Sequence, residues 1–356
     1  MEGLRGLAVF LVFLVHYSTL VQPWSGVDGF GPGLLHTAHT IGNAGVDLFF
    51  VLSGYLIYGS LIAGHQRFSR YVMRRLRRIY PTFLAVFAIY IALSQVFPNE
   101  NKIPRGAVDA AVYLSQNLLL LPGLFPIEPL ITVAWSLSYE MFYYLAMPLL
   151  IVVLSLRTRS AAWRIRFFVL LAGVSLLVFS LVGGHVRLVM FVAGVLLFDV
   201  LQTRGDSAPG SAVALAALVA SLAATLLPGA GPAAQALRTA VLSVGFFVLC
   251  FTCFAEPQAA IARAFCWTPA RWLGNMSYSY YLIHGLTLKA IFIVLAKLLP
   301  PGNAVDGLAA WMFVPAFGLT LLPAAALYLW VERPVSLQPS RRSLSPPAAA
   351  AATERS

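Results

Sequence analysis

The first apolar segment of the chain contains two ionisable side chains, Arg5 and His16, within the sequence RGLAVFLVFLVH. They are 11 positions apart. A helix turns about 100° and rises about 1.5 Å per residue, so both lie on one helix face, roughly 16 Å apart. An ionisable residue inside a membrane span is costly and normally marks a functional path through the protein. The pair therefore indicates chemistry performed within a membrane.

Three more ionisable side chains fall inside apolar sequence. They are Asp47 in NAGVDLFFVLSGYLI, Glu140 in AWSLSYEMFYYLAMP and His284 in GNMSYSYYLIHG. We expect all three to lie at depths that overlap with His16 and to line one cavity with it. A nearby carboxylate, Asp47 or Glu140, would orient the imidazole of His16 as a general base needs. Each residue alone could instead be a hydrogen-bonded packing residue, but the four together favour a site.

A basic cluster, RRLRRIYP, follows the second apolar stretch. On a helix Arg75 and Arg78 share one face, and Arg74 and Arg77 share another. Guanidinium groups pair well with phosphate oxygens, so the cluster suits a phosphate-bearing ligand. The alternative is that it anchors lipid headgroups and sets the membrane topology.

The elements that must position these residues are membrane helices. The 356-residue chain is 60% hydrophobic and only 10% charged, whereas a soluble domain carries about 25% charged residues. Apolar stretches close to the ~20 residues that cross a bilayer recur along nearly the whole chain. We predict an all-α, polytopic membrane bundle of about ten transmembrane helices, centred near Val12, Phe50, Ile89, Leu145, Leu171, Ala193, Val219, Val244, Leu286 and Leu321.

The net charge of +11 is concentrated in alternate connections. Basic residues follow the even-numbered stretches, at 67–78, 157–166, 263–271 and 333–342. Positive charge favours the cytoplasmic side, so we predict a multi-pass protein of the cell membrane with both termini in the cytoplasm. The basic balance then encodes orientation and does not point to nucleic acid. Residues 1–334 form the predicted membrane domain, and residues 335–356, rich in Ser, Pro and Ala, a disordered cytoplasmic tail.

Metal binding is not expected. Cys250 and Cys253 form a Cys-x-x-Cys pair inside apolar sequence without further ligands nearby, and buried packing is the ordinary use of such thiols. His36 and His39 have a spacing that could bind metal, but they fall in an expected external loop without an obvious third ligand.

Six motifs in order resemble the acyltransferase-3 family of integral membrane acyltransferases. The resemblance covers roughly residues 3–334, and it rests on RGLAVFLVFLVH, GVDLFFVLSGYLI, RRLRRIYP, WSLSYEMFYYLAMP, SYSYYLIH and VERP. It implies transfer of an acyl group, most often acetyl, from cytoplasmic acyl-CoA to a hydroxyl of a carbohydrate acceptor. Acyl-CoA would be a cosubstrate, and no bound cofactor is expected.

The resemblance also implies roles for residues at the matching positions. His16 becomes the candidate base or acyl relay, and Arg5 would position it or the acyl carbonyl. Arg75 and Arg78, with Arg74 beside them, would bind the donor. Other site candidates from the matching motifs are Glu140, His284, Tyr278, Trp135, Ser136 and Glu332.

Two other classes of function are compatible with the same residues. A membrane transporter of an acyl group or a small anionic substrate could carry the same polar residues, and so could an assembly subunit of a glycan export complex. Acceptor choice is expected to lie in the external connections 21–42 and 97–132.

Overall fold

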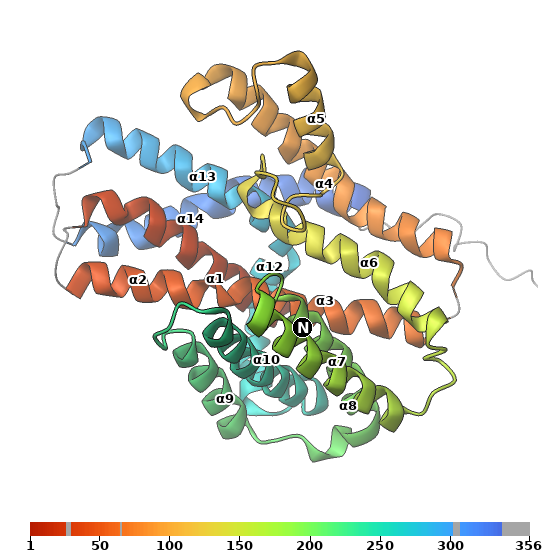
Figure 1. Cartoon of the computed structure of the whole chain (residues 1–356). Coiled ribbons are helices and arrows are strands. Elements are labelled where there is room, and N and C mark those ends of the chain that lie inside the picture. The colour runs from red at the N-terminus through yellow and green to blue at the C-terminus, as the bar shows by residue number, and fades with distance from the viewer. Residues whose placement is uncertain (26–29, 65, 302–306, 337–356) are drawn as a thin grey trace, which may run out of the picture.

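The structure is a computed structural model that describes residues 1–25, 30–64, 66–301 and 307–336. The regular elements within these ranges are all helices, with one isolated bridge between Pro122 and Phe125. The all-α prediction is confirmed. The helices, drawn in Figure 1, are α1 (Glu2–Val21), α2 (Phe30–Gly42), α3 (Ala44–Ile62), α4 (Phe68–Val96), α5 (Ala107–Leu118), α6 (Trp135–Val153), α7 (Ala161–Val182), α8 (Leu188–Arg204), α9 (Ser211–Ala224), α10 (Pro232–Ala255), α11 (Ala260–Phe265), α12 (Thr268–Asn275), α13 (Ser277–Leu298) and α14 (Leu308–Leu327), and α14 continues into a π-helical segment (Tyr328–Ser336).

The sequence predicts about ten membrane helices, and eight of these are full-length spans in the described part of the structure. Within the described ranges, eight helices are long and apolar enough to cross a membrane. All ten predicted centres lie in helices, but α8 has 17 residues and α9 has 14. At about 1.5 Å per residue these two helices measure roughly 26 Å and 21 Å, less than the ~30 Å of a hydrocarbon core. Hydropathy located the apolar stretches correctly and overestimated the length of two of them.

Helix α1 lies at the centre of the bundle and contacts α2, α3, α12 and α13. Helices α3 and α8 are in extensive contact, and glycine residues allow their backbones to approach closely. A Cβ on Gly54 would lie 2.2 Å from the carbonyl oxygen of Phe191, and one on Gly194 would lie 2.0 Å from that of Val51. Small residues allow helix backbones to approach closely in membranes, where packing drives association.

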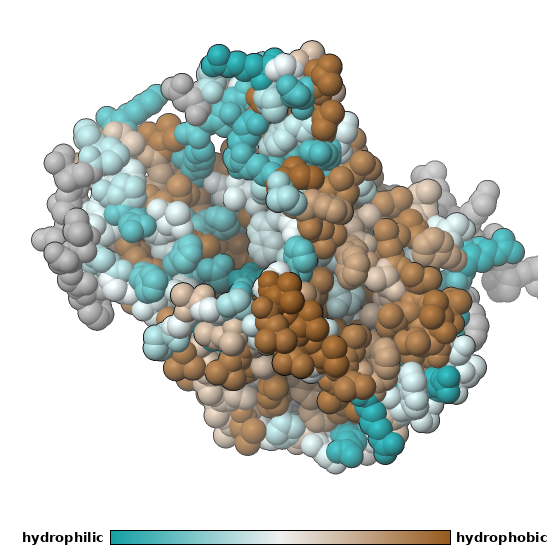
Figure 2. All heavy atoms as spheres, in the orientation of Figure 1, coloured by the Kyte–Doolittle hydropathy of each residue, from teal (hydrophilic) through white to brown (hydrophobic). Residues whose placement is uncertain are grey.

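Helix α7 forms part of the apolar outer surface. Only 6% of its most apolar 18-residue stretch is buried inside the protein, although the mean hydropathy of that stretch, 2.4, is the highest among the eight spans. Figure 2 shows a broad hydrophobic region on this face of the molecule, and the exposed side chains of α7 include Leu170, Leu177, Leu181 and Val182. Such a surface is suited to lipid.

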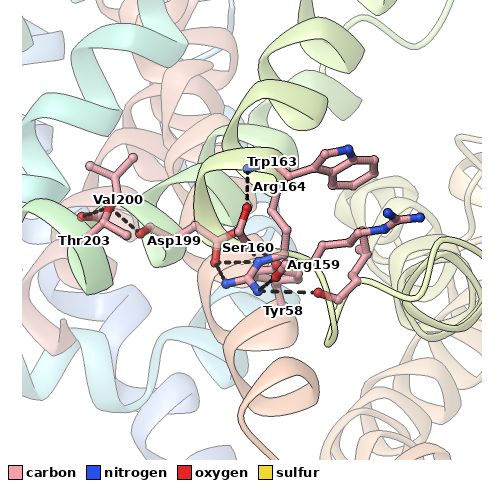
Figure 3. Close-up of polar contacts among 9 residues, drawn as sticks. Tyr58, Arg159, Ser160, Trp163, Arg164, Asp199, Val200 and Thr203 are labelled. Carbon is pink, nitrogen blue, oxygen red and sulfur yellow. Dashed lines mark hydrogen bonds and ion pairs between the residues drawn. The ribbon is translucent and has the colours of Figure 1, made fainter.

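A buried ion pair joins α7 to α8 (Figure 3). Arg164 Nη2 lies 2.6 Å from Asp199 Oδ1, and Arg164 Nε lies 3.0 Å from Asp199 Oδ2. Tyr58 of α3 donates a 2.9 Å hydrogen bond to the same carboxylate, which is fully buried. Arg164 also donates to the carbonyl of Arg159. Arg164 belongs to a basic cluster that was predicted only to set the membrane orientation. Its contacts link α3, α7, α8 and the connection before α7.

The predicted disordered tail lies almost wholly outside the described residues, because residues 337–356 are not among them. Val335 and Ser336 end the π-helical segment that contains VERP.

Candidate active site

A small cavity, here called the arginine cavity, contains both Arg5 and Arg78. Its volume is about 60 Å³. It lies where α1, α3, α4, α6 and α13 meet, and its polar lining residues are Arg5, Ser53, Arg78, Ser136, Glu140, Tyr144, Ser277, Tyr278 and Tyr281. A space of this size admits a few atoms and not a whole nucleotide.

The helical register of α4 divides the basic cluster into two faces. Arg75 and Arg78 are half-buried, whereas Arg74 and Arg77 are exposed. The Arg75 guanidinium lies over the rings of Tyr71 and Tyr144, 5.4 and 5.2 Å from their centres, and donates a 3.1 Å hydrogen bond to Ser60. Arg75 and Arg78 line one small space together, in agreement with the predicted shared helix face. The donor roles of Arg74, Arg75 and Arg78 stay predictions.

The two arginines of this cavity, and Arg75 beside it, form no ion pair with any carboxylate that the structure describes. Within the described residues, no ion pair involves Arg5, Arg75 or Arg78. Glu140 lines the same cavity but accepts its hydrogen bonds from Tyr144, at 2.5 Å, and from Ser53, at 3.4 Å. Guanidinium groups held inside a bundle without a paired anion are available to an anionic or carbonyl-bearing ligand.

The two histidines His16 and His284 lie in contact, on α1 and α13. Their ring centres are 4.9 Å apart at an interplanar angle of 69°. His284 Nδ1 lies 2.9 Å from the carbonyl oxygens of Tyr280 and Tyr281. Because carbonyls only accept, Nδ1 must carry the proton, which leaves Nε2 as an acceptor in the neutral ring. Nε2 is buried and has no hydrogen-bond partner among the described residues.

A larger and mostly apolar cleft, here called the histidine cleft, contains His16. Its volume is about 700 Å³. The walls come from α1, α4, α13 and the connection after α4, and three lysines line it, Lys102, Lys289 and Lys297. Lys102 pairs with Glu128 and Lys289 with Glu100. The connection 97–132, expected to influence acceptor choice, therefore forms one wall.

A hydrogen-bonded layer stands between the arginine cavity and the histidine cleft. Ser136 and Tyr281 line the first, and Val133 lines the second. The Ser136 and Tyr281 hydroxyls are 2.7 Å apart, and Tyr281 donates to the Val133 carbonyl at 3.0 Å. A group passing from one space to the other must go past this layer.

Two more predicted site residues anchor helices. The Tyr278 hydroxyl donates a 2.9 Å hydrogen bond to the carbonyl of Ile79 and so joins α13 to α4. Glu332 is buried and accepts from the backbone N–H of Ser279 at 3.1 Å and from its hydroxyl at 2.5 Å. These contacts fix the start of α13, the helix that carries His284.

Asp47 lies elsewhere, in a third space here called the Asp47 cavity. Its Oδ1 is 3.7 Å from Arg187 Nε, and the Arg187 guanidinium lies over the ring of Trp135 at 5.6 Å. The expectation that His16, His284, Glu140 and Asp47 line one cavity is therefore wrong. The contacts place the two histidines together, Glu140 with the arginines, and Asp47 with Arg187.

The residue that lies next to His16 is a second histidine, His284, and not the expected carboxylate. No hydrogen bond or ion pair among the described residues joins His16 to Asp47 or Glu140, whereas His284 contacts it directly. Sequence reasoning also missed Tyr144, Arg187 and Tyr281. Tyr144 follows Glu140 by four positions, a spacing that places both on one helix face, and this signal could have found it.

The candidate metal ligands do not gather. Among the described residues no group of three or more His, Cys, Asp or Glu side chains could hold a metal ion. The connection 21–42 was expected to be a loop, but its described part is largely α2, where His39 contacts Thr19 at 3.1 Å. Cys250 is a buried free thiol in the apolar core.

Fold and site define an integral membrane protein with two differently built spaces at opposite ends of one central helix. Comparison with known sequences places it more narrowly. A family model described as "Acyltransferase domain" matches residues 1–329, and the chain belongs to this family. The family resemblance found in the sequence motifs is thereby confirmed.

Two relatives carry informative names. A Bacillus subtilis (strain 168) protein named "Putative peptidoglycan O-acetyltransferase YrhL" is 26% identical, over 95% of this chain and 55% of its own. "O-acetyltransferase OatA" of Staphylococcus aureus (strain NCTC 8325) is 31% identical, over 43% of this chain and 24% of its own. The chain thus spans about half of the first relative and a quarter of the second. No solved structure matches the chain.

Proposed function

We propose that this chain is an integral membrane O-acyltransferase. It moves an acyl group, acetyl in the simplest case, from acyl-CoA to a hydroxyl of a carbohydrate acceptor, with His16 as the base or acyl relay. One observation carries the proposal: α1 presents Arg5 to the arginine cavity and His16 to the histidine cleft. A single helix then links a space suited to an anionic donor with a space that holds a base.

The donor is assigned to the arginine side because of its charge. Arg5, Arg75 and Arg78 have no carboxylate partner among the described residues, and phosphate oxygens pair well with guanidinium groups. The arginine cavity of about 60 Å³ is too small for the nucleotide, which would lie outward along α4. The thin pantetheine arm would pass through this cavity and past the layer of Ser136 and Tyr281, and so bring the thioester to His16. This arrangement supports acyl-CoA as the cosubstrate.

The chemistry assigned to His16 is proton transfer during ester formation. The acceptor hydroxyl oxygen attacks the thioester carbonyl, a C–O bond forms, and the C–S bond breaks. The hydroxyl proton passes to the imidazole of His16 and then to the departing CoA thiolate. In the relay variant, the imidazole nitrogen carries the acyl group before the hydroxyl does. His284 Nε2, an acceptor without a partner among the described residues, would orient the His16 ring by accepting its N–H.

The orientation follows from the basic connections. Clusters after α3 and α6 favour the cytoplasmic side, so the arginine side would face cytoplasmic acyl-CoA and both termini would be cytoplasmic. The histidine cleft would then open toward the other side of the cell membrane, where the acceptor lies. Peptidoglycan, named for one relative, is the first acceptor to test.

The direct test uses the purified full chain in lipid vesicles. Acetyl-CoA and a peptidoglycan fragment are added, and free CoA thiol and ester-linked acetate are both measured. An acyltransferase releases CoA and forms ester in equal amounts. A transporter moves substrate across the vesicle without releasing CoA, and that result would contradict the proposal.

Replacing Arg75 and Arg78 together with alanine is expected to raise the KM for acetyl-CoA at least about tenfold. Charge-assisted hydrogen bonds contribute about 1.5–3 kcal/mol each, and about 1.4 kcal/mol is a factor of ten. Steady-state CoA release at varied acetyl-CoA measures this change. Arg77→Ala, on the exposed face of the same helix, is the matched control and should leave the KM within about twofold. An unchanged KM in the double variant would remove these arginines from the donor site.

A further inference from the structure

The Asp47 cavity has no role in the proposed transfer, yet it is large and polar. Its volume is about 710 Å³. Its walls come from α2, the start of α3, the connection before α8, the connection between α9 and α10, and the start of α10. The polar side chains that line it are His36, Thr37, Thr40, Asn43, Asp47, Arg187, Thr225, Gln235, Arg238 and Thr239.

The carboxylate in this cavity is not fully satisfied. Asp47 is 4% exposed, and its Oδ1 has no hydrogen-bond partner among the described residues. The neighbouring Arg187 Nε is 3.7 Å away, too far for a hydrogen bond. Burying an ionised carboxylate with an incomplete set of donors is costly. A ligand that brings hydroxyl donors into the cavity would remove that cost.

The cavity wall is held in place by main-chain contacts. Arg238 donates to the carbonyls of Leu227 at 2.7 Å and Gly229 at 2.8 Å, so it fixes the connection between α9 and α10. Gln235, one helical turn before Arg238, is exposed and lines the same space. The cavity therefore combines a fixed wall with a free amide, a carboxylate and several hydroxyls.

We propose that the Asp47 cavity is a carbohydrate-binding site. It binds a part of the oligosaccharide that is distant from the reacting hydroxyl. A sugar offers hydroxyl donors to Asp47 and oxygen acceptors to Arg187 and to the amide of Gln235. This set of donors and acceptors matches a polyhydroxylated ligand better than an apolar one. The inference rests on the proposed function, because it assigns a second contact for the same carbohydrate acceptor.

The location agrees with a role in acceptor binding. Helix α2 separates this cavity from His16: His39 on α2 contacts Thr19 of the histidine cleft, and His36, Thr40 and Asn43 line the Asp47 cavity. A helix with its side chains is about 10–12 Å across. An oligosaccharide of several units would reach both spaces, whereas a single sugar would reach only one.

The test measures binding of the tetramer of N-acetylglucosamine to the purified full chain in detergent, by titration calorimetry. Gln235→Ala should weaken the affinity severalfold and Asp47→Asn at least tenfold. Gln202→Ala, an exposed glutamine at the other end of α8, is the matched control and should bind like the wild type.

The outcomes separate the inference from the proposed function. Tetramer binding that is severalfold weaker in Gln235→Ala but unchanged in Gln202→Ala supports the site, whether or not acetyl transfer is detected. Wild-type protein that does not bind the tetramer overturns the inference, as do equal affinities for the wild type, Gln235→Ala and Asp47→Asn. Should Asp47→Asn fail to fold, Gln235→Ala alone decides, because its side chain is exposed. CoA release measured in parallel reports on the proposed function independently.

Discussion

Replacing His16 with alanine is expected to lower the rate of ester formation by at least about 100-fold. A positioned base contributes about 10² to 10⁴-fold, and a covalent relay would be lost altogether. The arginine cavity would stay intact, because His16 lines the histidine cleft and not the arginine cavity. The KM for acetyl-CoA should therefore stay near the wild-type value while kcat falls. CoA release and ester-linked acetate on the purified chain measure both quantities.

Two further variants identify what His16 does. His284→Ala removes the ring that lies 4.9 Å from His16, and it should lower kcat less than His16→Ala does, because it removes orientation and leaves the base. His185→Ala is the matched control: this histidine bonds the Tyr139 hydroxyl at 2.6 Å and touches neither space. If His16→Ala retains ester formation close to the level of His185→Ala, His16 is neither base nor relay.

Removing the guanidinium of Arg164 is expected to destabilise the protein by about 3–5 kcal/mol, the range for breaking a buried ion pair. Asp199 is fully buried, and the side chain of Arg164 is only 13% exposed. In Arg164→Ala the carboxylate keeps Tyr58 as a donor but loses the positive charge and three hydrogen bonds from Arg164. Thermal unfolding in detergent, followed by near-ultraviolet circular dichroism, measures the loss.

The control for this prediction is Arg166→Ala, two positions away and exposed, which should change stability by no more than about 0.5 kcal/mol. Adding Asp199→Asn to Arg164→Ala should recover part of the lost stability, because no unpaired buried charge then remains. Equal unfolding temperatures for Arg164→Ala and Arg166→Ala would mean that the pair only sets orientation.

Much of the architecture could be predicted from local properties of the chain. All ten predicted apolar centres fall in helices, because hydropathy and helix formation in lipid are properties of about twenty consecutive residues. Helical spacing alone also placed Arg75 with Arg78 and Arg74 with Arg77, but only the structure shows that the first pair is the more buried one. The lengths of α8 and α9 did not follow from the sequence, because hydropathy locates the centre of an apolar stretch better than the residues at which its helix begins and ends.

The candidate site was predicted less completely. Its residue types were recognised, but their grouping was not: Glu140 lies with the arginines, and Asp47 lies with Arg187. Depth along a helix can be estimated from the sequence, whereas the direction of each side chain around the bundle cannot. Two residues at one depth can therefore face different spaces.

The sequence by itself determined that this is a helical membrane protein of the acyltransferase family, because composition and short motifs in a fixed order can be recognised without knowing how the helices pack. Only the tertiary structure decided which polar groups meet. His16 and His284 are 268 positions apart in the chain, and Arg5 and Glu140 are 135 apart. Such contacts depend on the rotation and close approach of helices such as α1 and α13. Those are set by the packing of small residues and buried hydrogen bonds across the whole bundle, and no local stretch of sequence contains that information.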